Sequence, residues 1–170
     1  MTVVRPEMPS DEPAIRAVHT SAFLCPVEAD LVDALRRSGR LLVSLVVELR
    51  GDVVGHVAFS PVTVEGSTMD ERGVGLAPLA VAPASQRQGL GGLLVTAGLR
   101  ASENGGHRFV VLLGSPTYYG RFGFTPGSAA GLTCLFGSGP EFQVRELVPG
   151  GLPRGGGRIL YAPEFDAFLP

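Results

Sequence analysis

The fold is decided by residues 79–94, which read Leu79-Ala80-Val81-Ala82-Pro83-Ala84-Ser85-Gln86-Arg87-Gln88-Gly89-Leu90-Gly91-Gly92-Leu93-Leu94. The apolar run before Pro83 is typical of a strand, and proline ends it. From Leu90 onward, apolar residues recur with the spacing of an amphipathic helix. A strand that passes through a glycine-rich loop into a helix builds an anion site, because the first helical amides lack intrahelical acceptors and carry partial positive charge.

The glycine-rich loop matches neither of two familiar phosphate-binding motifs. A dinucleotide fingerprint would need glycine where Leu94 stands, and a P-loop needs a lysine, which the chain lacks. Ser85 and Gln88 also have the spacing of a capping box, which would make residues 86–89 the first turn of the helix. Each glycine costs a helix roughly 1 kcal/mol relative to alanine. The three glycines at 89, 91 and 92 therefore favour a phosphate-binding loop over a helical turn.

Length and charge limit the class of protein. The chain has 170 residues, 45% of them hydrophobic, and a formal net charge of -2. This is the size and composition of one globular domain. Without a basic excess, nucleic acid is not expected as a partner. The absence of lysine also excludes Schiff-base and Ser-x-x-Lys chemistry.

Cysteine and histidine usage predicts no metal. Cys25 and Cys134 are too far apart for a Cys-x-x-Cys site and too few for a disulfide framework. No group of His, Asp and Glu has the spacing of metal ligands. Neither a signal peptide nor an apolar run long enough for a membrane span is recognisable. We therefore expect a cytoplasmic protein that contacts no membrane.

The remaining patterns predict alternating strands and helices. Strands are expected at 2–5, 41–49, 53–64, 73–81, 109–113, 142–148 and 158–161. Helices are expected from residue 11 or 12, over 28–38 and from 90 to about 104, with a single turn at 117–121. We expect His19 and His107 on the surface. This order of elements is typical of a mixed sheet with helices on both faces.

Two motifs carry a family resemblance. Gln86-x-x-Gly89-x-Gly91, directly after the strand that ends at Val81, resembles the cofactor-loop signature of the GNAT superfamily of N-acetyltransferases. About thirty residues later, Tyr118-Tyr119-Gly120-Arg121-Phe122-Gly123-Phe124 resembles that superfamily's second marker. The segments at 55–61 and 142–147 are similar to a bacterial subgroup of small acetyltransferases, the YhbS-like proteins.

The resemblance implies a fold. It is an α/β (α+β) arrangement of three αβα layers, whose central mixed and mostly antiparallel sheet is splayed between its fourth and fifth strands. Residues 1–170 would form a single N-acetyltransferase domain, with a core at 1–125 and C-terminal strands at 126–170. A homodimer is among the assemblies that the resemblance implies.

The resemblance also implies a reaction, in which an acetyl group passes from acetyl-CoA to a primary amine by direct attack in a ternary complex. The acceptor would be a small-molecule amine or a peptide amine. Tyr119 would protonate the departing thiolate or donate a hydrogen bond to it, and an amide near Val81 would polarise the thioester carbonyl. The implied cofactor-binding residues are Leu79, Ala80, Val81, Gln86, Arg87, Gln88, Gly89, Leu90, Gly91 and Gly92.

The general base is left open by the sequence. Members of the superfamily often carry a carboxylate on the fourth strand, but residues 73–81 contain neither Asp nor Glu. His56 on the third strand has an intrinsic pKa suited to a base near neutral pH. Glu65, Asp70 and Glu71 on the following loop are the other candidates. The missing carboxylate also fits an alternative function, a CoA-binding sensor or partner module of the same fold without catalysis.

Overall fold

The computed structural model describes residues 1–137 and 139–169. They form two compact units. The first unit comprises Met1–Phe59 and Ala77–Ala101, and the second comprises Ser60–Leu76 and the chain from Ser102 onward. The third and fourth strands each run through both units.

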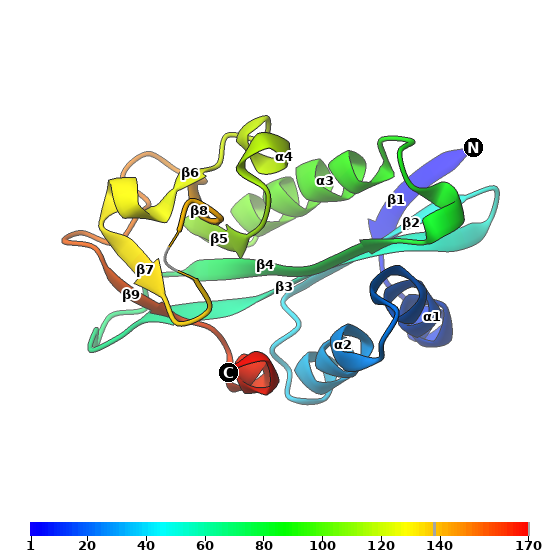
Figure 1. Ribbon diagram of the computed structural model, residues 1–170, viewed down its shortest axis with the longest axis horizontal. Coiled ribbons are helices and arrows are strands. Elements are labelled where there is room, and N and C mark those ends of the chain that lie inside the picture. The colour runs from blue at the N-terminus through cyan, green and yellow to red at the C-terminus, as the bar shows by residue number, and fades with distance from the viewer. Residues whose placement is uncertain (138, 170) are drawn as a thin grey trace. The chain divides into compact units, whose positions relative to one another are not determined.

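Nine strands and four α-helices are present in the described residues (Figure 1). The strands are β1 (Thr2–Pro6), β2 (Val43–Leu49), β3 (Asp52–Val64), β4 (Gly73–Val81), β5 (Phe109–Leu113), β6 (Thr125–Pro126), β7 (Leu132–Cys134), β8 (Phe142–Glu146) and β9 (Gly157–Leu160). The helices are α1 (Glu12–Phe23), α2 (Val27–Arg37), α3 (Leu90–Asn104) and α4 (Pro116–Gly120). The strand order β1-β2-β3-β4-β5-β8-β6, in which β4 and β5 pair in parallel, confirms the predicted mixed, mostly antiparallel sheet with packed helices.

In the first unit, the β2–β3 hairpin is the centre of the packing. Its turn residues Arg50 and Gly51 have φ of 56° and 92°, which is the left-handed conformation that two-residue hairpin turns require. Helices α1 and α2 lie on one side of these strands and α3 lies on the other (Figure 1). A Cβ at Gly55 would face Leu94 of α3. Because side chains alternate along a strand, His56 faces α1 and α2.

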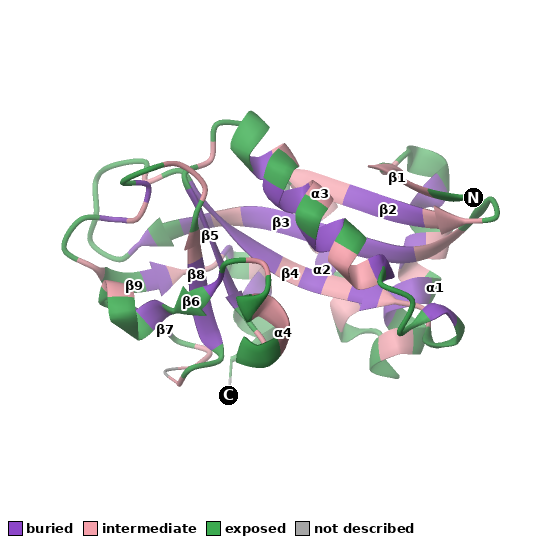
Figure 2. Ribbon diagram, turned by 90° about the horizontal axis from the view of Figure 1, so that it is seen from above, coloured by how far each residue is buried: buried purple, intermediate pink, exposed green. Residues whose placement is uncertain are grey.

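The helices bury one face each, as their apolar spacing predicts. Ile15 of α1 and Val32 of α2 pack with Val46 of β2 in one buried cluster. Figure 2 shows that the middle of β2 and β3 is buried, whereas α3 alternates between buried and exposed residues. Burying an apolar side chain of this size contributes about 1.5–3 kcal/mol. Hydrophobic contact therefore holds the helices on the strands.

Arginine supplies the charged cross-links because the chain has no lysine. Arg36 of α2 reaches Glu7, just beyond β1, with Nε–Oε1 at 2.9 Å. Further pairs join Arg5 to Asp11 and Glu48, Arg16 to Asp30 and Asp33, Arg36 to Asp33 and Glu12, and Arg158 to Glu65. The pair between Arg158 and Glu65 is exposed at both ends and contributes little, about 0–1 kcal/mol. In contrast, Asp11 is buried and Glu7 is half-buried.

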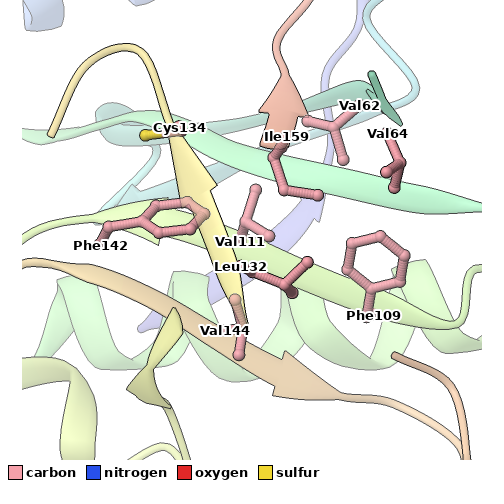
Figure 3. Packing of buried hydrophobic residues seen from close by; sticks show 9 residues of the cluster. All are labelled: Val62, Val64, Phe109, Val111, Leu132, Cys134, Phe142, Val144 and Ile159. Carbon is pink, nitrogen blue, oxygen red and sulfur yellow. The ribbon is translucent and has the colours of Figure 1, made fainter. Parts of the chain in front are cut away.

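The second unit is built around an apolar cluster between short strands (Figure 3). Its buried members are Val62, Val64, Phe109, Val111, Leu132, Cys134, Phe142, Val144 and Ile159. The parallel ladder between β4 and β5 covers Gly73–Gly75 and Phe109–Val111, and β8 pairs antiparallel with all five residues of β5. Residues 109–112 are all buried, and because side chains alternate between the two faces of a strand, both faces of β5 are covered, which explains its uninterrupted apolar sequence.

Phe59 and Gly98 fit together in the first unit and make a test of the packing. A Cβ at Gly98 would lie 2.3 Å from Cε2 of the fully buried Phe59. Alanine gains up to about 1 kcal/mol of helix propensity over glycine, but overpacking costs about 1–3 kcal/mol. We expect Gly98→Ala to lower the free energy of urea unfolding by about 1–2 kcal/mol. Gly120→Ala is the control, because its Cβ would meet nothing within 4 Å. An equal loss in both variants would contradict this account.

Candidate functional site

The segment between β4 and α3 is not helical. Pro83–Ser85 form one 3-10 turn, Gln86 is extended with φ -68° and ψ 162°, and the helix starts at Leu90. Arg87 and Gly89 have φ of 61° and 80°. Left-handed backbone at these two positions cannot continue a helix. The alternative in which Ser85 caps a helix starting at Gln86 is therefore wrong.

The same backbone leaves a run of amides open. The α-helical hydrogen bonds begin with the one from the Leu93 amide to the Gly89 carbonyl, at 3.1 Å. In the described part of the chain, no hydrogen bond runs from the amides of residues 87–92 to a backbone carbonyl. A Cβ at Gly89 would meet nothing within 4 Å. The exposed Arg87 forms no ion pair with an acid among the described residues. Open amides and a guanidinium together supply hydrogen-bond donors for an anion.

The end of β4 presents its other amides away from β3. The Ala82 amide donates to the Val54 carbonyl at 2.8 Å, so Ala82 faces β3. Successive residues of a strand direct their amides to opposite edges. Val81 and Leu79 therefore face the opposite edge of β4. The Val81 carbonyl accepts a hydrogen bond from Nε2 of Gln86 at 2.9 Å, which fastens the loop to this edge.

Tyr119 lies in the second unit on the short helix α4. Ser115 caps this helix, since its Oγ accepts the Tyr118 amide at 3.3 Å. The Tyr119 ring packs against the backbone of Gly114, where a Cβ would lie 2.4 Å from Cε2, and against Phe124 with ring centroids 6.0 Å apart. Burial raises the pKa of the Tyr119 hydroxyl to about 12, so the hydroxyl keeps its proton at neutral pH.

His56 is fully buried in the first unit, with both ring nitrogens engaged. Nδ1 lies 2.8 Å from Nε2 of His19, and Nε2 lies 2.7 Å from Oγ of Ser44. Oε2 of Glu7 is 3.5 Å from the same Nε2. Burial lowers the pKa of His56 and outweighs the opposing effect of Glu7. A direct contact between this ring and an amine would need one of these bonds to open.

The prediction that His19 lies on the surface is wrong. Its side chain is 0% exposed. His19 stands four residues after Ile15, on the side of α1 that carries the apolar residues, and this spacing was the signal for burial. His107 is half-buried.

Two partners of the histidines, Glu7 and Ser44, were not found from the sequence. Glu7 follows β1 and accepts hydrogen bonds from Ser44 and from the Arg36 guanidinium. Burial alone would raise the pKa of Glu7, but hydrogen bonds from His56, Arg36 and Ser44 outweigh burial and hold that pKa below its usual range. Glu7, Ser44 and His56 lie on or next to different strands, so no local spacing in the sequence predicts that they form a cluster.

The loop acids that were candidates for the base have other partners. Glu65 forms an ion pair with Arg158 at 2.7 Å, and both are exposed. Oδ1 of Asp70 accepts the Arg72 amide at 2.9 Å, and Glu71 accepts from Ser67 at 3.1 Å. All of these bonds lie within the second unit and stabilise the loop before β4.

In residues 1–137 and 139–169, no group of three or more His, Cys, Asp or Glu is placed to hold a metal ion. No helix in the same residues has the length and apolar character needed to cross a bilayer.

Comparison with known proteins identifies relatives over the whole chain. The model of the acetyltransferase (GNAT) domain matches residues 3–127. The N-acetyltransferase YhbS of Escherichia coli is 40% identical over 168 residues, which is 98% of this chain and 99% of that protein. The E. coli N-acetyltransferase YjhQ is 41% identical over 119 residues, covering 69% of this chain and 66% of YjhQ.

Two solved structures are also similar. The crystal structure of E. coli YhbS in complex with CoA has a TM-score of 0.91 and 39% identity, covering 97% of this chain and 92% of that one. A GNAT family acetyltransferase from Brucella melitensis in complex with acetyl-CoA has a TM-score of 0.82 and 37% identity, with 98% and 99% covered. Family match, full-length identity and fold agree, and the chain therefore belongs to the GNAT family of N-acetyltransferases.

Proposed function

We propose that this protein transfers the acetyl group of acetyl-CoA to a primary amine, by direct attack of the amine on the thioester in a ternary complex. The observation that carries the proposal is the open run of amides at residues 87–92. Two relatives with 39% and 37% identity were crystallised with CoA and acetyl-CoA, respectively. The proposal treats residues 1–170 as one acetyltransferase domain.

The loop and the start of α3 would hold the diphosphate of the cofactor. The amides of residues 88–92 would donate to phosphate oxygens, and the positive end of α3 adds to the attraction. Arg87 is exposed and would add a forked, charged donor. Gln86 supports the site indirectly, because its hydrogen bond to Val81 ties the loop to β4.

The free edge of β4 would hold the thioester end of the cofactor. Leu79 and Val81 face away from β3, so the Val81 amide is available to donate to the thioester oxygen as charge develops on it. The pantetheine arm would lie along Leu79, Ala80 and Val81. The expected divergence of β4 from β5 beyond Gly75 remains a prediction.

Tyr119 would complete the reaction as the general acid. The amine nitrogen forms a bond to the acetyl carbon, the C–S bond breaks, the acylated nitrogen gives up one proton to a base, and the sulfur takes the hydroxyl proton of Tyr119. Because its pKa is raised, Tyr119 is protonated at neutral pH and is available to donate to the sulfur as it leaves.

The strand β4 carries no acid, and this observation favours one alternative, a CoA-binding module without catalysis. The two functions differ in the fate of the thioester. The protein is incubated with acetyl-CoA and an amine, and the release of free thiol is measured. The panel of amines consists of polyamines, amino acids, aminoglycosides and peptide amines. Amine-dependent release supports the enzyme, whereas cofactor binding without release supports the alternative.

Gly89 tests the diphosphate site. Gly89→Leu places a side chain in the space that the phosphates would fill, and we expect acetyl-CoA affinity in isothermal titration to fall by roughly tenfold or more, about 1.4 kcal/mol. Gly39→Leu is the matched control. Gly39 has φ 76° against 80° for Gly89, and neither Cβ would meet an atom within 4 Å. Both variants therefore carry the same backbone strain, and equal affinities would refute the site.

Tyr119 tests the acid. Tyr119→Phe keeps the ring that packs on Gly114 and Phe124 and removes only the hydroxyl. We expect kcat to fall roughly 100-fold while the KM for acetyl-CoA changes little. Tyr118→Phe is the control, since its ring contact with Arg121, 4.2 Å from the guanidinium carbon, survives the change. Unchanged kcat in Tyr119→Phe would remove this residue from the mechanism.

A further inference from the structure

A chain of hydrogen bonds runs through the buried side of the first unit, on the face of the strands that α1 and α2 cover. It begins at His19 of α1, passes through His56 of β3 and Ser44 of β2, and reaches Glu7. At the far end of this series of hydrogen bonds, the Arg36 guanidinium of α2 donates two hydrogen bonds to Glu7, at 2.9 and 3.0 Å. Both histidines are 0% exposed.

The direction of these bonds follows from the charge on Glu7. The paired Glu7 is ionised at neutral pH and can only accept, so the single hydroxyl proton of Ser44 goes to Glu7. Ser44 Oγ must then accept from Nε2–H of His56. A neutral His56 with its proton on Nε2 has a bare Nδ1, which accepts from Nε2–H of His19.

This order leaves one nitrogen without a partner. Nδ1 of His19 is unprotonated, is buried, and has no hydrogen-bond partner among the described residues. An unsatisfied buried acceptor costs about 1–3 kcal/mol, and such groups in native proteins call for a reason. The series of hydrogen bonds therefore ends in a buried lone pair held in a fixed orientation.

The chain of bonds lies beside the strand that is proposed to hold the thioester. The Ala82 amide binds the Val54 carbonyl, and the antiparallel register continued from this pair sets His56 level with Ala80. The Cβ position of Gly55 lies 3.2 Å from the Ala80 carbonyl, in agreement with this register. His56 is thus one strand away from the Leu79–Val81 segment.

We propose that His19, through Nδ1, accepts the proton of the acceptor amine, and that His56, Ser44 and Glu7 are positioning residues that hold the base in this tautomer. The inference rests on the proposed acetyl transfer. After the amine nitrogen has bonded to the acetyl carbon, that nitrogen carries the positive charge, and its N–H proton passes to Nδ1. The C–S electron pair leaves with sulfur, which takes the Tyr119 proton. The products are an N-acetyl amide and CoA thiol, with His19 protonated and Tyr119 deprotonated until solvent resets both.

The environment of His19 suits a base that must stay unprotonated before the reaction. Burial, with a smaller contribution from the nearby His56, lowers the pKa of His19 to about 3. An ordinary ammonium would not yield its proton to such a base, but a nitrogen already bonded to the carbonyl carbon is far more acidic. The ionised Glu7 at the other end of the chain stabilises the imidazolium that forms. The ring of Phe23, one turn further along α1, stacks on the His19 ring with centroids 6.1 Å apart and is 39% exposed, so a rotation of Phe23 would give an amine access to His19.

His19→Gln separates this role from a structural one. The Nε2 of glutamine can replace the donor to His56, while the lone pair at Nδ1 is lost. We expect kcat with a reactive amine of the panel to fall roughly 100-fold or more, with unchanged KM for acetyl-CoA. His107→Gln, at the remaining histidine, is the matched control and should keep full kcat. Wild-type kcat in His19→Gln would overturn the inference, whereas absence of any turnover in the wild type would overturn the proposed function instead.

The double variant with Glu7→Gln tests the coupling. If Glu7 acts through His19, Glu7→Gln lowers kcat in the wild-type background and has little further effect in His19→Gln. Independent, multiplicative losses would overturn the assignment of Glu7 as a positioning residue.

The tautomers of His19 and His56 can be determined in the absence of an amine substrate. Two-bond proton–nitrogen NMR correlations of the histidine rings, recorded at pH 7, report which nitrogen carries hydrogen. We expect His19 and His56 both to be neutral with the proton on Nε2. A proton on Nδ1 of His19 would overturn the inference, since the base would then have no lone pair to offer.

Discussion

Two residues with left-handed backbone keep the connection between β4 and α3 out of the helix, and the rest of the candidate site depends on them. If Arg87 and Gly89 were helical, the amides of residues 90–92 would bond back to carbonyls of the preceding turn. Holding a non-glycine residue such as Arg87 at φ 61° costs on the order of 1–2 kcal/mol. This unfavourable conformation leaves the backbone amides of residues 87–92 free to donate hydrogen bonds to a ligand.

The first unit also buries polar side chains where apolar ones would be simpler to accommodate. A set of apolar side chains would fill the space of His19, His56 and Ser44 without needing partners. Polar groups there are stable only because nearly every donor and acceptor is matched. The one atom left over, Nδ1 of His19, is the exception that a satisfied network would not need. The left-handed loop and the buried polar cluster both lie in the first unit, which also contains residues 79–81. Both features are explained by the proposed acetyl transfer.

Patterns within one element were sufficient to predict most of the fold. The long strands and α3 were found within a few residues, because apolar runs and turn residues coincide there. β6 and β7 have only two and three residues, too few for a recognisable period. The cofactor loop was predictable because glycines in a helical position conflict with helix propensity.

Contacts between elements could not be predicted in the same way. His19 was interpreted as a surface residue because its polarity outweighed its core-facing spacing. Glu7 and Ser44 are separated by 37 positions in sequence, and an isolated acid next to a turn resembles any solvated residue. His56 was singled out from its intrinsic pKa, but only the packed structure shows that both its nitrogens are engaged. Tertiary structure decides which polar residues are buried, and local sequence records little of it.

The exclusive use of arginine in the ion pairs has a consequence for a protein that handles an activated acyl group. The ε-amino group of a lysine next to bound acetyl-CoA could be acetylated by the thioester. Acetylation would remove the positive charge that an ion pair needs. A guanidinium remains protonated at any physiological pH and is a poor nucleophile. The pairs that join Arg36 to Glu7 and Arg5 to Asp11 are therefore inert toward the donor. With no lysine in the sequence, no side chain of this protein competes with the acceptor as a primary amine.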